Sequence, residues 1–331
     1  MKDENKAAPF DLDFYGSHLR KIKEHPCFDE QACHLFGRMH LPVAPKCNIQ
    51  CNYCVRDFDC VNETRPGVCS KVITPKEAVG YVRKAIKKFQ YIKVIAIAGP
   101  GEPLYNEETF ETLRLIKENF PHLMKCLSTN GLLLPEKSSI LKELDVGNLT
   151  VTVNAIDPKT GAKIYSFVNH HGKVLKGEEG ARVLMENQLE GIKRTVKNKT
   201  VVKVNTVYIP GINDEQIVEV AKRVKKLGVY MQNIIPLIPQ YKFANIKPPT
   251  REDFKKKQEE CGKVLKQMVH CRRCRADAVG KLDTTYRIRC ILIDAVLVHN
   301  TIIQLKYAVT NVNKLFIQKM VLDREKSWWR L

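Results

Sequence analysis

The stretch Cys47-Asn-Ile-Gln-Cys51-Asn-Tyr-Cys54 places three cysteines within eight residues, directly after the apolar segment Leu41–Pro45. Four-iron four-sulfur clusters usually have four cysteine ligands, so three thiolates in one loop leave one iron open for a substrate or cofactor. A structural zinc site normally takes four protein ligands and C-x2-C pairs. Three neighbouring cysteines cannot pair among themselves, and no feature of the sequence indicates secretion, which disfavours a disulfide framework. The loop therefore predicts an iron–sulfur cluster.

The composition of the 331-residue chain is that of a soluble globular protein, with 44% hydrophobic and 27% charged residues. The first residues, Met-Lys-Asp-Glu-Asn-Lys, are charged and lack the apolar run of a signal peptide. No apolar stretch reaches the roughly 20 residues that span a bilayer, and the best candidate, Ile291–Val298, is short and contains Asp294. We therefore expect a cytoplasmic protein that does not contact a membrane.

Twelve cysteines in a chain of this kind favour metal or redox chemistry over disulfides. The net charge of +19 raises the alternative of a nucleic-acid-binding protein. The lysines recur on segments that we expect to be solvated helix faces, such as Arg83–Lys88 and Lys222–Lys226, and no stretch interleaves a basic patch with aromatic residues. We expect no nucleic-acid partner, while an anionic substrate or an acidic protein partner stays open.

An alternation of strands and helices begins at Leu41. Six apolar runs are typical of buried parallel strands: Leu41–Ala44, Val94–Ala98, Met124–Leu127, Leu149–Val153, Val201–Val207 and Met231–Ile235. Between them lie segments of helical period: Thr74–Gln90, Glu107–Asn119, Ser138–Leu144, Gly180–Val196 and Asp214–Leu227. Repeated β-α units of this kind have right-handed crossovers, and they predict an α/β fold, a partial (β/α)6 barrel with its functional site at the carboxyl ends of the strands.

The expected strand ends carry the polar motifs. The cysteine loop follows the first strand, Gly99-Pro-Gly-Glu-Pro103 the second and Ser128-Thr-Asn-Gly131 the third, while Asn154 ends the fourth. Glycines let the backbone approach a ligand, and Glu102 can accept hydrogen bonds from an ammonium group. The hydroxyl and amide groups of the third motif suit a ribose or a carboxylate, although such a motif is also a common helix cap. Their agreement at successive strand ends predicts one shared site.

Both ends of the chain carry further candidate metal ligands. His18, His25, Cys27, Cys33, His34 and His40 lie within the segment 1–40, and Cys271-Arg-Arg-Cys274 lies far downstream. A C-x2-C pair on its own cannot complete a zinc site and needs partners from elsewhere, for which Cys27, Cys33, Cys60 and Cys126 are available. We divide the chain into an N-terminal ligand extension (1–40), a barrel (41–240), a C-terminal Cys-x2-Cys extension (241–282) with a charged helix over Arg251–Met268, and a tail (283–331) without an assigned function.

The C-x3-C-x2-C loop, with an aromatic residue between its last two cysteines, resembles that of the radical S-adenosylmethionine (SAM) enzymes. Within that superfamily the chain is similar to the NifB family of nitrogenase-cofactor maturases. Six strings carry the resemblance: His40-Leu-Pro-Val-Ala-Pro-Lys-Cys-Asn-Ile-Gln-Cys-Asn-Tyr-Cys54, Asp59-Cys-Val-Asn-Glu-Thr-Arg-Pro-Gly67, Ala98-Gly-Pro-Gly-Glu-Pro-Leu104, Ser128-Thr-Asn-Gly-Leu132, Thr152-Val-Asn-Ala-Ile-Asp-Pro158 and Cys271-Arg-Arg-Cys-Arg-Ala-Asp-Ala-Val-Gly280. It extends from about His18 to Gly280, and the last string is the most specific.

The resemblance implies a radical SAM type of partial barrel with N- and C-terminal extensions that bind three four-iron clusters. Two of these clusters are substrates, which are fused into an eight-iron, carbide-centred precursor of the nitrogenase cofactor. One SAM supplies the carbon by methyl transfer, and reductive cleavage of a second gives a 5′-deoxyadenosyl radical that abstracts hydrogen. It also implies an electron donor and cluster-carrier or scaffold proteins of nitrogenase assembly as partners.

The residue roles implied by the resemblance are as follows. Cys47, Cys51 and Cys54 bind the cluster whose open iron chelates SAM, and the cofactor is surrounded by Tyr53, Gly99, Gly101, Glu102, Ser128, Thr129, Asn130 and Asn154. His40, Cys27, Cys60 and Cys126 hold one substrate cluster, and Cys33, Cys271 and Cys274 hold the other. Glu63 and Arg65 act beside Cys60 in proton handling.

The chain departs from the family pattern at Val55, at Asp57 and at the additional thiol Cys69, and none of these changes removes an expected ligand. Another radical SAM enzyme with auxiliary clusters, such as a molybdopterin-precursor cyclase, shares the barrel and a C-terminal cysteine set. It does not account for His40 and the cysteines around the first loop. A zinc-stabilised nucleic-acid-binding protein agrees with the charge but leaves the three-cysteine loop unexplained.

Overall fold

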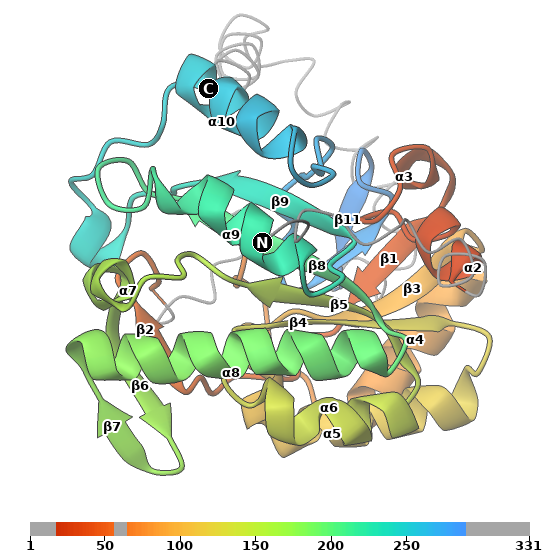
Figure 1. Ribbon diagram of the computed structural model, residues 1–331. Helices are drawn as coiled ribbons and strands as arrows, with labels where there is room; N and C mark the ends of the chain where they lie inside the picture. Colours follow the sequence, from red (N-terminus) through yellow and green to blue (C-terminus); the bar gives the residue numbers. More distant parts are fainter. Residues whose placement is uncertain (1–17, 56–64, 289–331) are drawn as a thin grey trace, which may run out of the picture. The chain divides into compact units, whose positions relative to one another are not determined.

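An eight-stranded sheet forms the centre of the computed structural model of this chain (Figure 1), which describes residues 18–55 and 65–288. Six of its strands are parallel and follow the order β1-β3-β4-β5-β8-β9. Their bounds are Gly37–His40, Ile92–Ile97, Met124–Thr129, Val146–Thr152, Val201–Tyr208 and Met231–Pro236. In the described residues the strand order starts at β11 and ends at β9 without closing into a ring. The predicted partial (β/α)6 barrel is confirmed.

The first strand lies earlier than the sequence predicted. We expected it at Leu41–Ala44, but β1 ends at His40, and from the expected segment Ala44 alone makes a bridge, to Pro100. The segment after β1 contains Pro42 and Pro45, which have no amide hydrogen to donate. This segment therefore cannot pair with neighbouring strands on both of its sides. The consequence is that Arg38 and His40 are strand residues of the central sheet.

Two short antiparallel strands extend the sheet beyond β1. Strand β10 (Ala278–Gly280) pairs with β1, and β11 (Thr285–Arg287) pairs with β10. In Figure 1 these blue strands lie beside the red β1, although more than 230 residues separate them in sequence (Arg38 pairs with Gly280). The segment that follows Cys271 and Cys274 is thereby brought next to the N-terminal ligands.

Helices α4, α5, α6 and α8 lie along one face of the sheet (Figure 1). Helix α4 begins with a capping box between Thr74 and Glu77 and with Pro75 at its first position. The helices of the described residues span Leu19–Lys23 (α2), Ala32–Leu35 (α3), Pro75–Lys88 (α4), Glu107–Asn119 (α5), Leu134–Glu143 (α6), Pro158–Ile164 (α7), Gly177–Lys197 (α8), Gln216–Lys225 (α9) and Arg251–Gly262 (α10). Single 3-10 turns occur at Pro103–Tyr105 and Tyr241–Phe243. Helix α6 starts four residues before its predicted start, and α10 ends before the predicted Met268.

A second, three-stranded sheet was not predicted. It consists of β2 (Ile49–Cys51), β6 (Tyr165–His170) and β7 (Lys173–Leu175), all antiparallel. Gln50 pairs with Phe167, and the amide of Asn169 donates to the carbonyl of Asn48 at 2.7 Å. The cysteine loop is therefore held by ladder hydrogen bonds to a β-hairpin.

The strand register places a set of polar side chains on one face of the parallel sheet, the face opposite the side chain of Lys125. His40 is aligned with Ala96 and Cys126, and Thr150 with Ser128 and Lys203. Alternate residues of a strand share a face. The shared face, called the inner face below, therefore carries Arg38, His40, Cys126, Ser128, Thr150, Thr152, Lys203, Asn205 and Asn233.

In the described part of the chain no helix has the length and apolar character to cross a membrane.

Candidate functional site

A cavity of about 170 Å³ lies at the carboxyl ends of the first strands of the parallel sheet. All three cysteines of the loop line it, together with Tyr53 and Tyr165. The rest of its lining comes from the strand ends that the sequence predicted: Ala98, Pro100, Gly101, Glu102, Ser128, Thr129, Asn130 and Thr152, with Ile49 from β2. The structure therefore brings together the predicted residues of the first three loops except Gly99, which does not line this cavity.

The cysteine loop is packed in a way that suits a cluster held by three thiolates. The side-chain amide of Gln50 donates to the carbonyls of Cys51 and Cys54, at 3.0 and 2.9 Å. All three cysteines are half-buried and line the same cavity. A three-cysteine set around one cavity supplies the donors for all but one iron of a four-iron cluster.

Gly101 lies against the backbone at the start of the cysteine loop. A β-carbon at this position would be 2.3 Å from the carbonyl oxygen of Lys46, so no residue except glycine fits. The amide of Gly101 donates to the carbonyl of Ala44 at 2.6 Å, and that of Glu102 donates to the carbonyl of Lys46 at 2.8 Å. We expected the glycine to permit close approach of a ligand; the structure shows that it permits close approach of the two loops.

Glu102 is buried and connects the second loop to the third. Its carboxylate accepts hydrogen bonds from the Thr129 hydroxyl at 2.5 Å, the Asn130 amide at 2.6 Å and the Leu104 amide at 3.0 Å. Burial raises the pKa of Glu102 to about 7, although these three hydrogen bonds oppose the rise. The carboxylate thus orients the residues around it, while the side chain also lines the cavity.

Asn154 lies behind the cavity wall and is not among its lining residues. Its amide donates to the hydroxyls of Tyr53 at 2.8 Å and Tyr165 at 3.1 Å, and its carbonyl oxygen accepts from the amide of Val207 at 2.9 Å. Asn213, from the loop after β8, donates to the backbone carbonyl of Asn154. In the structure Asn154 therefore positions the two tyrosines that line the cavity, and its predicted contact with the cofactor stays a prediction.

A second group of ligand-type residues gathers on and beside the inner face. Cys27 packs against two buried clusters, one containing Phe28 and Cys126 and the other containing Cys33. Cys271 and Cys274 pack against the same cluster as Cys33. The chain thus places two cysteines from its N-terminal part, one from β4 and two from the downstream C-x2-C pair in one region of the structure.

His40 also belongs to this group. Its Nδ1 lies 2.8 Å from the carbonyl oxygen of Arg275, which can only accept, so Nδ1 carries the proton. Burial, with the nearby Arg38 guanidinium, lowers the pKa of His40 to about 4. The ring is therefore neutral with an unprotonated Nε2, the form that binds metals.

Burial raises the pKa of the Cys27 thiol to about 11 and that of the Cys126 thiol to about 12. The Lys203 ammonium opposes both increases. Thiolates at these positions need a strong positive partner, which the iron of a cluster provides.

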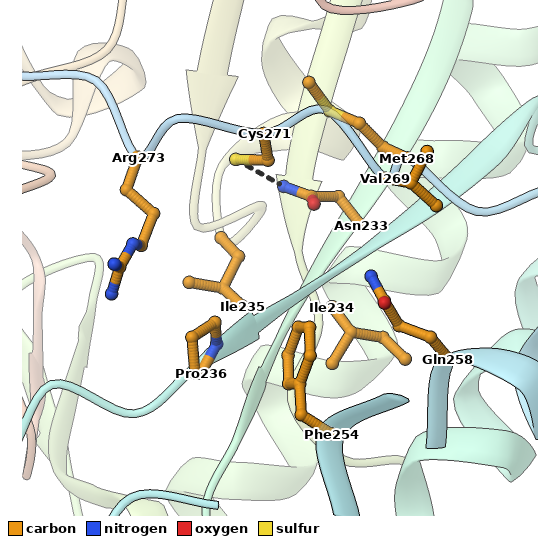
Figure 2. A pocket seen from close by; sticks show the side chains of 10 residues that line it. All are labelled: Asn233, Ile234, Ile235, Pro236, Phe254, Gln258, Met268, Val269, Cys271 and Arg273. Carbon is orange, nitrogen blue, oxygen red and sulfur yellow. Dashed lines mark hydrogen bonds between the residues drawn. The ribbon is translucent and has the colours of Figure 1, made fainter. Parts of the chain in front are cut away.

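Three polar residues of this region were missed by the sequence analysis: Arg38, Lys203 and Asn233. Arg38 donates to the sulfur of Cys274 at 2.8 Å. Figure 2 shows Asn233, whose amide donates to the sulfur of Cys271 at 3.4 Å, in a cavity of about 160 Å³ between β9, α10 and the segment around Cys271. A signal for such residues was present in the sequence: Lys203 and Asn205 are polar residues at alternate positions of an otherwise apolar strand, and alternate positions share one face of a sheet.

Some predicted residues have no described environment in this site. Cys60 and Glu63 lie outside the described residues. Arg65 is buried, and its carbonyl accepts a hydrogen bond from Val68. The metal-ligand role of Cys60 and the catalytic roles of Glu63 and Arg65 stay predictions. Cys69 and Cys261, for which no such role was predicted, are buried and do not line either cavity.

Comparison with known proteins agrees with this geometry. The family model of the radical SAM superfamily matches residues 41–224. The chain is 49% identical over 281 residues to the FeMo cofactor biosynthesis protein NifB of Methanocaldococcus jannaschii, covering 84% of this chain and 90% of that protein. The chain belongs to the NifB family.

Some relatives are longer than this chain. The relative from Klebsiella pneumoniae is 44% identical over 269 residues, which make up 79% of this chain and 58% of that protein. The chain therefore spans little more than half of such relatives. Among solved structures, Streptococcus suis SuiB has a TM-score of 0.52 at 16% identity, covering 81% of this chain and 55% of that one. That likeness extends to the fold alone.

Proposed function

We propose that this NifB-family chain is a radical SAM enzyme of nitrogenase-cofactor maturation. It fuses two four-iron four-sulfur clusters and inserts a SAM-derived carbon as carbide, which makes the eight-iron precursor of the cofactor. The observation that supports this most is the second group of ligand-type residues on the inner face, beside the cysteine-loop cavity. A radical SAM enzyme without auxiliary or substrate clusters needs only the first of these two sites.

At the first site, Cys47, Cys51 and Cys54 would hold the cluster and leave one iron for the amino and carboxylate groups of SAM. This cluster, when bound, supplies the electron that cleaves SAM. Tyr53 and Tyr165 form one wall of the cavity and are oriented by Asn154. The hydroxyl and amide groups of Ser128, Thr129 and Asn130 form another wall, where Glu102 orients two of them.

At the second site, the iron–sulfur clusters are substrates. His40, Cys27, Cys126 and Cys60 would hold one of them, and Cys33, Cys271 and Cys274 the other. The Nε2 of His40 would be the most exchangeable ligand, because a neutral imidazole leaves iron more readily than a thiolate. Glu63 and Arg65 would handle protons near Cys60. An electron donor and cluster-carrier proteins of nitrogenase assembly would complete the cycle.

The alternative function is that of a radical SAM enzyme with ordinary auxiliary clusters. Three four-iron clusters give an expected content of about twelve irons per chain after anaerobic reconstitution. Because auxiliary clusters also add iron, iron content alone does not fully separate the proposed function from this alternative. We also expect label from methyl-labelled SAM in an iron–sulfur product that a chelator extracts. Four irons per chain, or an unlabelled product in the presence of twelve, would overturn the proposal.

The roles of the two sites are separated by a pair of variants. Cys54→Ala is expected to abolish SAM cleavage and to retain about eight irons per chain in the substrate clusters. Cys261→Ser, which changes a buried cysteine on α10 outside both cavities, serves as the matched control and should retain cleavage. Cleavage by the Cys54→Ala variant would show that the cysteine loop does not hold the SAM-binding cluster.

A further inference from the structure

Two cations are buried on the inner face of the sheet. Arg38, on β1, is fully buried, and Lys203, on β8, has an exposed fraction of 5%. The register places both side chains on the face that also carries His40 and Cys126. Moving an ammonium or guanidinium group out of water is costly unless an opposite charge or a full set of acceptors replaces the water.

The acceptors around Arg38 are neutral groups and one sulfur. Its guanidinium donates to the carbonyls of Gly280 and Lys281, to the hydroxyl of Thr285 and to the sulfur of Cys274, the last at 2.8 Å. None of these is a carboxylate. Among the described residues, the thiol of Cys274 is the one hydrogen-bond partner of this guanidinium that can become anionic.

The surroundings of Lys203 follow the same pattern. Its ammonium donates to the carbonyl of Cys27 at 3.3 Å and to the sulfur of Met268 at 3.5 Å, and it lies 5.1 Å from the centre of the Phe28 ring. A carbonyl, a thioether and an aromatic ring are weak partners for a buried cation. They hold the ammonium between Cys27 and the segment before Cys271.

Two other buried cations of the described residues, Lys125 and Arg275, have carboxylate partners. Lys125, on β4, pairs with Asp145 at 3.2 Å on the opposite face of the same sheet. Arg275 pairs with Asp277 at 2.8 Å, an acid whose charge also acts on His40. Arg38 and Lys203 differ from these two cations, because no carboxylate is among their hydrogen-bond partners in the described residues.

We propose that Arg38 and Lys203 are the counter-charges for the anionic substrate of this site. They hold thiolate-ligated iron–sulfur clusters by charge, Arg38 through the Cys274 thiolate and Lys203 from the side of Cys27. This inference rests on the proposed function, because the anion is the substrate cluster. It assigns positioning residues that lie outside the set of iron ligands.

The test compares Lys203→Met with Lys125→Met, a matched pair of buried lysines on opposite faces of one sheet. In the cluster-free protein, Lys203→Met should raise the midpoint of thermal unfolding, because it removes a buried cation that has no carboxylate partner in the part of the chain that the structure describes. In the reconstituted protein, the same variant should lose iron to a chelator about tenfold faster than the wild type, since a charge–charge interaction at a few ångströms is lost. Its substrate clusters should also have reduction potentials shifted to more negative values, because a nearby cation stabilises the reduced, more negative cluster.

The control should show none of these cluster effects. Lys125→Met should change unfolding by the same amount with and without clusters, and it should leave iron loss and potentials as in the wild type. Lys203→Arg restores the charge, so it should restore slow iron loss and the wild-type potentials. Arg38→Lys should keep the potentials close to those of the wild type, which separates charge from the guanidinium hydrogen bonds.

Three results would overturn the inference. If Lys203→Met lowered stability equally with and without clusters and left the potentials unchanged, Lys203 would be a packing residue. If the wild type itself bound only four irons, the proposed function would fail and the inference with it. If the wild type bound twelve irons and Lys203→Met lost iron at the wild-type rate, the inference about Lys203 would be rejected while the proposed function would stand.

Discussion

Replacement of Gly101 by alanine should separate the two loops that form the cysteine-loop cavity. The added β-carbon would lie 2.3 Å from the Lys46 carbonyl oxygen and 2.7 Å from the Pro45 carbonyl oxygen. Both contacts are with backbone, which cannot rotate away, so the cost belongs at the upper end of the range for overpacking, about 3 kcal/mol. If the loops part, the hydrogen bonds from Gly101 to Ala44 and from Glu102 to Lys46 are also lost.

Each of these two hydrogen bonds contributes on the order of 1 kcal/mol. The total loss is therefore about 3 to 5 kcal/mol, a large fraction of the about 5 to 15 kcal/mol that stabilises a typical domain. SAM cleavage should fall by about 100-fold or more, because a displacement of about 1 Å at a reacting centre has an effect of that size.

Gly80→Ala is the matched control for this substitution. Gly80 lies within α4, and nothing is within 4 Å of an added β-carbon there. Alanine should stabilise this helix by about 0.5 to 1 kcal/mol. The two changes have the same chemistry, and the structure assigns them opposite signs.

The free energy of unfolding is measured by urea titration of the cluster-free protein, followed by circular dichroism under reducing conditions. The rate of SAM cleavage is measured on the reconstituted protein. Wild-type stability and a wild-type rate of SAM cleavage in Gly101→Ala would refute the reasoning. So would a loss of stability in Gly80→Ala as large as that in Gly101→Ala.

Three further predictions concern single side chains. His40→Ala should lower the iron content by about four per chain and leave the cysteine-loop cluster intact, as measured by iron analysis and electron paramagnetic resonance; an unchanged spectrum would exclude a ligand role. The pKa of Glu102 rises on folding from 4.5 to about 7, so the folded protein keeps a proton that the unfolded chain loses. The contribution of Glu102 to the free energy of unfolding is then largest below pH 4.5 and falls by about 3 kcal/mol as the pH rises to about 7. In urea titrations at several pH values, Glu102→Gln should lack this fall. If the free energies of unfolding of the wild type and of Glu102→Gln changed in parallel with pH, burial of the carboxyl would have no such effect. Asn154→Ala should release the hydroxyls of Tyr53 and Tyr165 and weaken SAM binding about tenfold with no loss of iron; unchanged affinity would show that the tyrosines are oriented without it.

The sequence alone determined the elements that depend on local pattern. The apolar runs and helical segments predicted five of the six parallel strands in place, and α5 was predicted with its observed bounds. These signals are local because a buried parallel strand and an amphipathic helix each repeat over a few residues. The spacing of Cys47, Cys51 and Cys54 carried the cluster prediction for the same reason.

The tertiary structure decided which distant residues meet. Arg38 and Lys203 lie 165 positions apart in the sequence, and each by itself is an ordinary basic residue. Only the register of the sheet, together with the pairing of β10 with β1, places them around Cys27, Cys126 and Cys274. The hairpin β6–β7 that anchors the cysteine loop is a second case. Such contacts depend on the pairing of remote strands, for which a side chain's own neighbours in the sequence contain no signal.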